Sequence, residues 1–165
     1  MDNRNTMFET LARNADIIRG VRWVATLDLA TRPECRIRDL LEYTPTLEPV
    51  AHSIPWHRGP GKIKRHCRCV SAFVLIPFSE IGLAEPPPGT RASMHGQVPA
   101  NLSYAKWIVM QPAWAIEQAV GVVRARLLIR GGMKFPQLYD LHGEYLLISE
   151  LRQRFPPAFE AAGFK

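Results

Sequence analysis

The feature that most limits how this chain can fold is the number and placement of its prolines. Fourteen prolines are spread over 165 residues, and each one fixes a backbone dihedral angle and removes an N–H donor. The longest apolar run, residues 70–78, already contains Ser71 and Pro77. This pattern leaves no stretch of the ~18–20 apolar residues that a membrane-spanning helix needs. It predicts an irregular, loop-rich architecture rather than a regular helical bundle.

Between the prolines, short hydrophobic patterns predict an α+β fold. Residues 3–16 have the spacing of a helix, which we expect Gly20 to end. Residues 21–27 alternate between apolar and polar, as in a short half-buried strand, and 68–77 predict a strongly buried second strand. We expect the first half to combine these short strands with irregular Cys-bearing loops, including a turn of helix at 35–42, packed against a helical second half.

The second half is predicted to consist mostly of helices. Ser103 is a suitable cap for a short helix, and a longer helix is expected over about 112–130. Pro156 should interrupt a last helix. Residues 84–90 include three consecutive prolines and form the clearest connector. We therefore expect one domain over residues 1–165, with any internal sub-boundary at this connector.

The charge balance suits an anionic partner. Lys and Arg outnumber Asp and Glu by 21 to 15, and sixteen of the 21 are arginines, which bind phosphates in a bidentate manner. One basic segment precedes the second predicted strand and contains the candidate DNA-contacting residues Arg58, Lys62, Lys64, Arg65 and Arg68. Basic loops of this kind contact phosphate backbones without reading bases. The alternative is a solvated surface that only keeps the protein soluble.

The three cysteines form a candidate metal site. Their odd number and the polar, acid-containing N-terminal segment argue against a secreted disulfide scaffold and for an intracellular protein. Cys67 and Cys69 are two residues apart, and thiolates suit zinc. The candidate ligands are Cys35, His66, Cys67 and Cys69, with His52 or His57 as other nitrogen donors. Buried free thiols or a disulfide remain alternatives.

No catalytic motif stands out, and we expect the chain not to be an enzyme. It has no nucleophile elbow, no phosphate-binding glycine loop and no HExxH zinc motif. The alternative is a nuclease or other DNA-processing enzyme that uses Cys35, Asp39 and a nearby histidine. A third reading is a binding module for host nucleic acid. Asp28 and Thr31 are expected to shape the turn after the first strand.

Four blocks of residues, in order along the chain, share their pattern with one family. The first comprises 22–28, 31–36, Arg38 and Asp39; the second comprises 54–56, 59–63 and 67–71. The third comprises 90–94, 96–99, Tyr104, Trp107 and 111–112; the fourth comprises 117–118, 120–121, Arg124, Leu127, Gly132 and 150–151. Over roughly residues 20–152 the chain resembles phage head morphogenesis proteins, the minor head proteins of the phage Mu protein F type.

This resemblance implies a virion structural protein of low copy number that acts in head assembly and in DNA packaging or delivery. Its implied partners are the portal protein, the major capsid protein or both, together with double-stranded DNA bound without sequence preference, and no membrane. The implied location is the phage head, and the host cytoplasm during assembly. The resemblance also implies that Cys35 and Cys67 lie close together.

The chain departs from the family pattern at three positions. The family usually has glycine after the Arg-Asp pair, where this chain has Leu40. It usually has histidine three residues before the Cys-Arg pair, where this chain has Lys64, and often aspartate where this chain has His95. The change at Lys64 leaves His66 or His57 to supply a nitrogen ligand.

Overall fold

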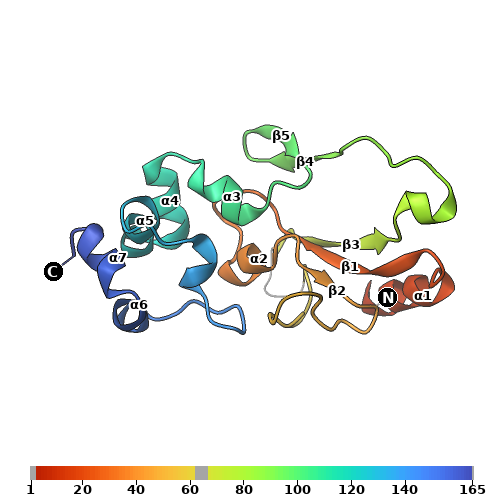
Figure 1. Cartoon of the computed structure of the whole chain (residues 1–165), viewed down its shortest axis with the longest axis horizontal. Coiled ribbons are helices and arrows are strands. Elements are labelled where there is room, and N and C mark those ends of the chain that lie inside the picture. Colours follow the sequence, from red (N-terminus) through yellow and green to blue (C-terminus); the bar gives the residue numbers. More distant parts are fainter. Residues whose placement is uncertain (1–2, 62–66, 165) are drawn as a thin grey trace.

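The computed structural model describes residues 3–61 and 67–164, with side chains from residue 6 onward (Figure 1). The first half contains α1 (Asn3–Arg13), β1 (Ile18–Val24), α2 (Pro33–Arg38), β2 (Glu42–Tyr43), β3 (Val70–Leu75) and the 3-10 helix η1 (Phe78–Ile81). The second half contains β4 (Thr90–Ser93), β5 (Gly96–Pro99), α3 (Tyr104–Val109), α4 (Ala113–Val120), α5 (Val122–Ile129), η2 (Phe135–Leu138), α6 (Ile148–Arg154) and α7 (Pro156–Ala161). The α+β class predicted from the sequence is confirmed.

The first half is organised around an antiparallel sheet with the strand order β2-β1-β3. Central β1 pairs Val21 with Tyr43 on one side and with Phe73 on the other. Gly20 lies inside this strand, where a Cβ atom would come within 2.2 Å of the Tyr43 carbonyl oxygen. The expectation that Gly20 ends the first helix is therefore wrong: α1 ends at Arg13, and Gly20 permits the close approach of two backbones.

The expectation of a strongly buried second strand is also wrong. Five of the six residues of β3 are exposed, and Val74 alone is buried. Val70 keeps 58% and Phe73 42% of its surface in contact with solvent. The physical reason is that side chains of a strand point to the faces of the sheet, and most of those of edge strand β3 are left uncovered, whereas Val21 and Trp23 on central β1 are covered.

The helical half differs from the expected pattern at one point. The helix predicted over 112–130 is two helices, α4 and α5, separated by Gly121, whose φ of +83° belongs to the left-handed region that favours glycine. Other boundaries are confirmed: the Ser103 hydroxyl accepts the Lys106 N–H at 3.4 Å, and a new helix begins at Pro156. None of the helices in the described residues is long and apolar enough to cross a bilayer.

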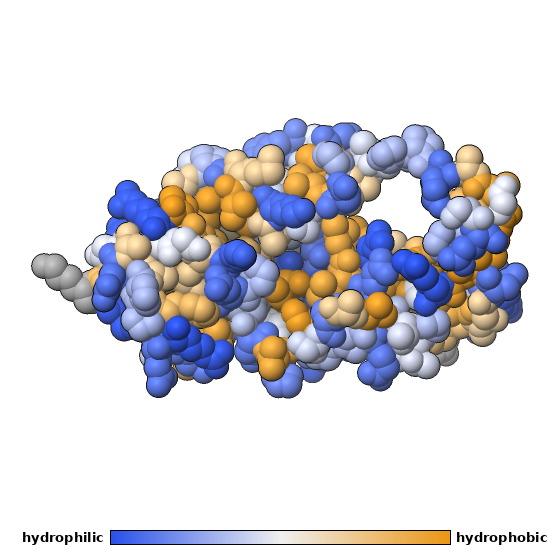
Figure 2. Space-filling model, viewed as in Figure 1, coloured by the Kyte–Doolittle hydropathy of each residue, from blue (hydrophilic) through white to orange (hydrophobic). Residues whose placement is uncertain are grey.

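Two hydrophobic cores lie side by side along the long axis of the molecule. The core of the first half includes Trp23, Tyr43 and Trp56. That of the helical half includes Tyr104 and Leu127. The exposed connector 82–89 arches from η1 to the β4–β5 hairpin, and Figure 2 shows an opening between this arch and the rest of the molecule. Contacts elsewhere hold the two halves together, among them a hydrogen bond from the Met94 N–H to the Leu27 carbonyl at 2.9 Å.

Candidate metal centre

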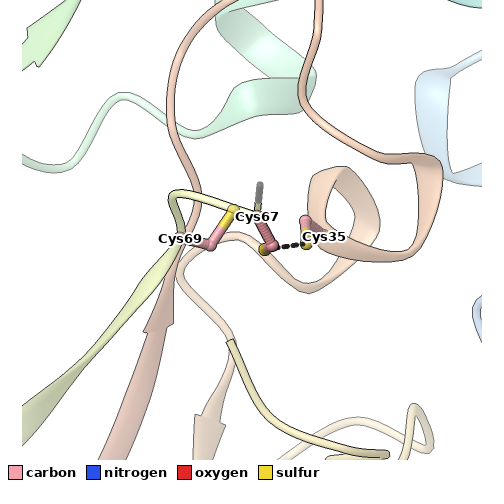
Figure 3. Close-up of side chains that lie close together, drawn as sticks. All are labelled: Cys35, Cys67 and Cys69. Atoms are coloured by element: carbon pink, nitrogen blue, oxygen red, sulfur yellow. Dashed lines mark hydrogen bonds between the residues drawn. The ribbon is translucent and has the colours of Figure 1, made fainter. Parts of the chain in front are cut away.

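Three cysteine side chains converge where α2 meets the start of β3 (Figure 3). The sulfur atoms of Cys35, Cys67 and Cys69 all lie within 4.8 Å of one another, and the Sγ atoms of Cys35 and Cys67 are 3.6 Å apart. Cys35 and Cys69 are buried, and Cys67 is partly exposed. The closeness of Cys35 and Cys67 implied by the family resemblance is thus observed.

Local structure on both sides fixes this geometry. Pro33 occupies the first turn of α2, and the backbone N–H of Cys35 donates to the Arg32 carbonyl at 3.0 Å, which holds the thiol on the inner side of the helix. Cys69 precedes Val70, whose pairing with Val24 of β1 fixes the start of β3. The cluster therefore links two segments that are more than thirty residues apart in the sequence.

The pKa values of Cys35 and Cys69 are shifted in opposite directions. A hydrogen bond with the Cys35 thiol lowers the pKa of Cys69 to about 6, with a further contribution from the Thr26 backbone, although burial opposes this shift. The same hydrogen bond, together with burial and the neighbouring sulfurs, raises the pKa of Cys35 above its ordinary value. Cys69 is therefore the first of the pair to become a thiolate, which is the form that binds metals.

The three cysteines could form a metal site. Thiolate sulfurs are soft ligands that suit zinc and other thiophilic ions, and a structural zinc site takes four ligands. Among the described residues, the cluster consists of the three cysteines alone. The predicted fourth ligand, His66, lies outside the described residues, as do the predicted DNA-contacting residues Lys62, Lys64 and Arg65.

The alternative histidine ligands are not part of this cluster. His52 Nε2 lies 2.9 Å from the Glu42 carbonyl oxygen, and its Nδ1 accepts the Ile54 N–H at 3.2 Å. Both ring nitrogens of His52 therefore have protein partners. His57 is exposed and has a φ of +62°, and it does not join the three sulfurs.

Two members of the predicted DNA-contacting segment lie within the described residues, and both are exposed. The Arg68 guanidinium forms an ion pair with Asp28 while keeping 59% of its side-chain surface exposed. Asp28 also accepts the backbone N–H groups of Ala30 and Thr31, each at 2.9 Å, which confirms the expected turn after the first strand. Arg58 precedes Gly59 on the same segment.

The arginines of α5 are held by aromatic rings rather than presented as a second basic surface. Arg124 lies over the Tyr145 ring and donates to the Leu146 carbonyl at 2.8 Å. Arg126 lies over the ring of Phe164.

A second group of buried polar residues, around the end of α2, was not predicted from the sequence to have a structural role. Arg36, Arg38 and Asp39 are each at most 6% exposed. Asp39 accepts the backbone N–H of Ala25 at 2.8 Å and that of Tyr104 at 2.6 Å, and both of its oxygens bind Arg91. Its carboxylate is fully used in holding the fold, and this weakens the nuclease alternative, which needs Asp39 to be available.

Arg36 and Arg38 donate hydrogen bonds to acceptors on distant segments, most of which are backbone carbonyls. Arg38 donates to Pro55 at 2.9 Å and to His142 at 2.7 Å. Arg36 donates to Ala119 at 2.8 Å and to the Tyr145 hydroxyl at 3.1 Å. In the sequence, these residues are visible only as three charged residues within four positions at the end of a short predicted helix. The same pattern is equally typical of a solvent-exposed helix surface.

Comparisons with protein-family models, with curated proteins and with solved structures find no match to this chain.

Proposed function

We propose that this protein is a non-catalytic structural component of a phage or prophage head, of the minor head protein type. The observation that carries the proposal is a set of contacts made by the end of α2. Arg38 binds the Pro55 carbonyl, Asp39 binds Arg91, and Arg36 binds the Ala119 carbonyl. Pro55 and Arg91 belong to the second and third blocks, and Ala119 lies between the first residues of the fourth, 117–118 and 120–121. The four resembling blocks are thus joined through buried contacts of the first, as expected if the shared pattern reflects one fold.

A departure from the family pattern also supports the proposal. Leu40 stands where the family usually has glycine, and its φ is +64°. This left-handed conformation is favoured by glycine and costs other residues roughly 1–2 kcal/mol. The backbone at this position thus has the conformation that would select glycine in relatives, although this chain has leucine.

The exposed apolar side chains suit a protein that acts by binding other proteins. Large apolar side chains are exposed in both halves, including Val70 and Phe73 on the edge strand β3 and Met110 and Trp114 around α3 and α4. Figure 2 shows apolar residues, in orange, reaching the surface among charged ones. These exposed apolar side chains are the proposed protein contacts. The proposed partners are the portal protein, the major capsid protein or both.

Within this role, we assign zinc to the three-cysteine cluster as a structural ion. It would hold α2 against the start of β3, in a half whose described residues form a three-stranded sheet. The ion would supply a cross-link rather than chemistry. The basic segment 58–68 would contact packaged DNA through phosphates. The proposed location is the phage head, and the host cytoplasm during assembly.

Deletion of the gene in the phage or prophage that encodes it tests this function. We expect a loss of infectious particles, restored by a plasmid copy, and detection of the chain by mass spectrometry in purified wild-type heads. Heads that assemble, package DNA and infect normally without the gene would show that the assembly role is wrong.

A further inference from the structure

The three-cysteine cluster contains more than a metal-binding geometry, because one pair of sulfur atoms is in contact. Cys35 Sγ and Cys67 Sγ are 3.6 Å apart, and Figure 3 shows the Cys67 side chain directed toward Cys35. Cys35 is fully buried on α2, whereas Cys67 is partly exposed at the start of the loop that leads into β3. An oxidant therefore has access to one member of the pair, whose neighbour lies directly behind it.

We propose that Cys35 and Cys67 form a disulfide in oxidising conditions once the cluster holds no metal, and that Cys69 stays a free thiol. The same link between α2 and the start of β3 then persists in both redox states, through a metal when reduced and through a covalent bond when oxidised. This inference stands on the thiol geometry and does not depend on the phage-head function.

The contact distances and the chain connectivity select this pair. Cys67 and Cys69 are separated by one residue, so a bond between them would close a small ring with strained disulfide geometry. Cys35 and Cys69 are both buried, at 0% and 5% exposure, which shields that pair from a dissolved oxidant. The sulfur atoms of Cys35 and Cys67 are in contact, and Cys67 is accessible to a dissolved oxidant. A bond between them would close a loop of about 32 residues.

The oxidation balances with hydrogen peroxide as the oxidant. Peroxide first oxidises the accessible Cys67 thiol to a sulfenic acid, and this step releases one molecule of water. The Cys35 sulfur then attacks the Cys67 sulfur and the sulfur–sulfur bond forms. The S–O bond breaks, and the hydroxyl group leaves with the Cys35 proton as a second molecule of water. In total, two thiols lose two electrons and two protons, and the peroxide takes up both to become two molecules of water.

Peptide mapping of the full chain tests the proposal directly. The protein is purified in reductant, stripped with EDTA, treated with hydrogen peroxide, blocked with iodoacetamide and digested with trypsin. Arg68 lies between Cys67 and Cys69, so trypsin places these two cysteines on different peptides, and Cys35 lies on a third that ends at Arg36. We expect a cross-linked pair joining the Cys35 and Cys67 peptides, with iodoacetamide on Cys69.

A Cys69→Ser variant is the matched control, and it should form the same disulfide. Cys67→Ser should form none. Oxidation should raise the Tm of the metal-free chain by roughly 5–10 °C, since the bond restricts the unfolded state. Three alkylated cysteines after peroxide, or a bond that includes Cys69, would overturn the proposal. Zinc content is measured separately before stripping, so a failure of the zinc assignment cannot be confused with a failure of disulfide formation.

Discussion

The two carboxylate oxygens of Asp39 accept hydrogen bonds from the two terminal nitrogens of Arg91, at N···O distances of 2.9 and 3.0 Å, although the residues are 52 positions apart in the sequence. The Asp39 side chain has no exposed surface and that of Arg91 has 9%. Arg91 also donates to the Ala25 carbonyl, which belongs to the segment following β1. This buried ion pair is one of the contacts that attach the β4–β5 hairpin to the first half of the molecule, together with the bridge between Leu27 and Ser93.

Replacing Asp39 should therefore be among the most destabilising single changes. Both oxygens of Asp39 accept hydrogen bonds, so the amide group of Asp39→Asn would face donors and leave Arg91 without its counter-charge. We expect a loss of about 3–5 kcal/mol in the free energy of unfolding, measured with urea. The partly exposed pair of Arg22 and Glu42 provides the control, and Glu42→Gln should cost less than about 1 kcal/mol. Equal effects would contradict the structural role of Asp39.

Leu40 offers the opposite prediction, a stabilising change. At φ +64° glycine relieves backbone strain, and part of this gain is offset by the greater flexibility of glycine in the unfolded chain. Leu40→Gly should raise stability by about 0.5–1 kcal/mol, or the Tm by about 2 °C. Leu41→Gly should be destabilising, because Leu41 packs against the core of the first half. A lower Tm for Leu40→Gly would refute the argument from backbone conformation.

Substitution of Gly143 should lower the stability of the fold, because both its backbone conformation and the close packing around it disfavour a side chain. Its φ is +80°, and a Cβ atom there would lie 2.8 Å from Arg38 Nη1 and 3.1 Å from the Ile54 side chain. Gly143→Ala would displace the Arg38 guanidinium from its carbonyl partners, at a cost of about 2–4 kcal/mol. Gly132 has a φ of +70° with open space around its Cβ position. Gly132→Ala should therefore cost only about 1–2 kcal/mol in thermal or urea unfolding.

Protein purified without chelator should contain about one zinc ion per chain, as measured by elemental analysis. Removal of the ion with EDTA should lower the Tm, because the link between α2 and β3 is lost. Cys67→Ser should reduce the zinc content, whereas His52→Ala should leave it unchanged, since His52 lies outside the cluster. Less than about half an equivalent of zinc in the wild-type protein would exclude a structural zinc site.

Binding to double-stranded DNA should be weak and salt-dependent. If the five basic residues of the 58–68 segment contact phosphates, log affinity should fall against log salt with a slope of up to about −4. Alanine at Arg58, Lys62, Lys64, Arg65 and Arg68 together should abolish this dependence. Alanine at Arg124 and Arg126 is the control, because both arginines lie over aromatic rings. Binding that ignored salt, or that survived the fivefold replacement, would dismiss this surface.

The sequence alone determined the features that depend on a few neighbouring residues. The turn at Asp28 and Thr31, the cap at Ser103 and the helix break at Pro156 follow from side-chain hydrogen bonds or from the geometry of proline. The α+β class followed from hydrophobic periodicity. The grouping of Cys35 with Cys67 was available from the sequence through the resemblance to a family, and the structure brings these sulfurs together.

Tertiary structure alone decided the features that depend on a partner far along the chain. Residues 68–77 are apolar enough for a buried strand, but burial depends on which distant segments pack over the faces of the sheet, and five of the six residues of β3 remain exposed. Gly20 was assigned as a helix breaker because nothing near it in sequence reveals the Tyr43 carbonyl. From the sequence alone, Arg36, Arg38 and Asp39 have the pattern of surface charges. In the structure they are buried, because their hydrogen-bond partners come from distant parts of the chain, as far as Tyr145. Burial of a charge is determined by the groups that surround it in space, and local sequence does not contain that information.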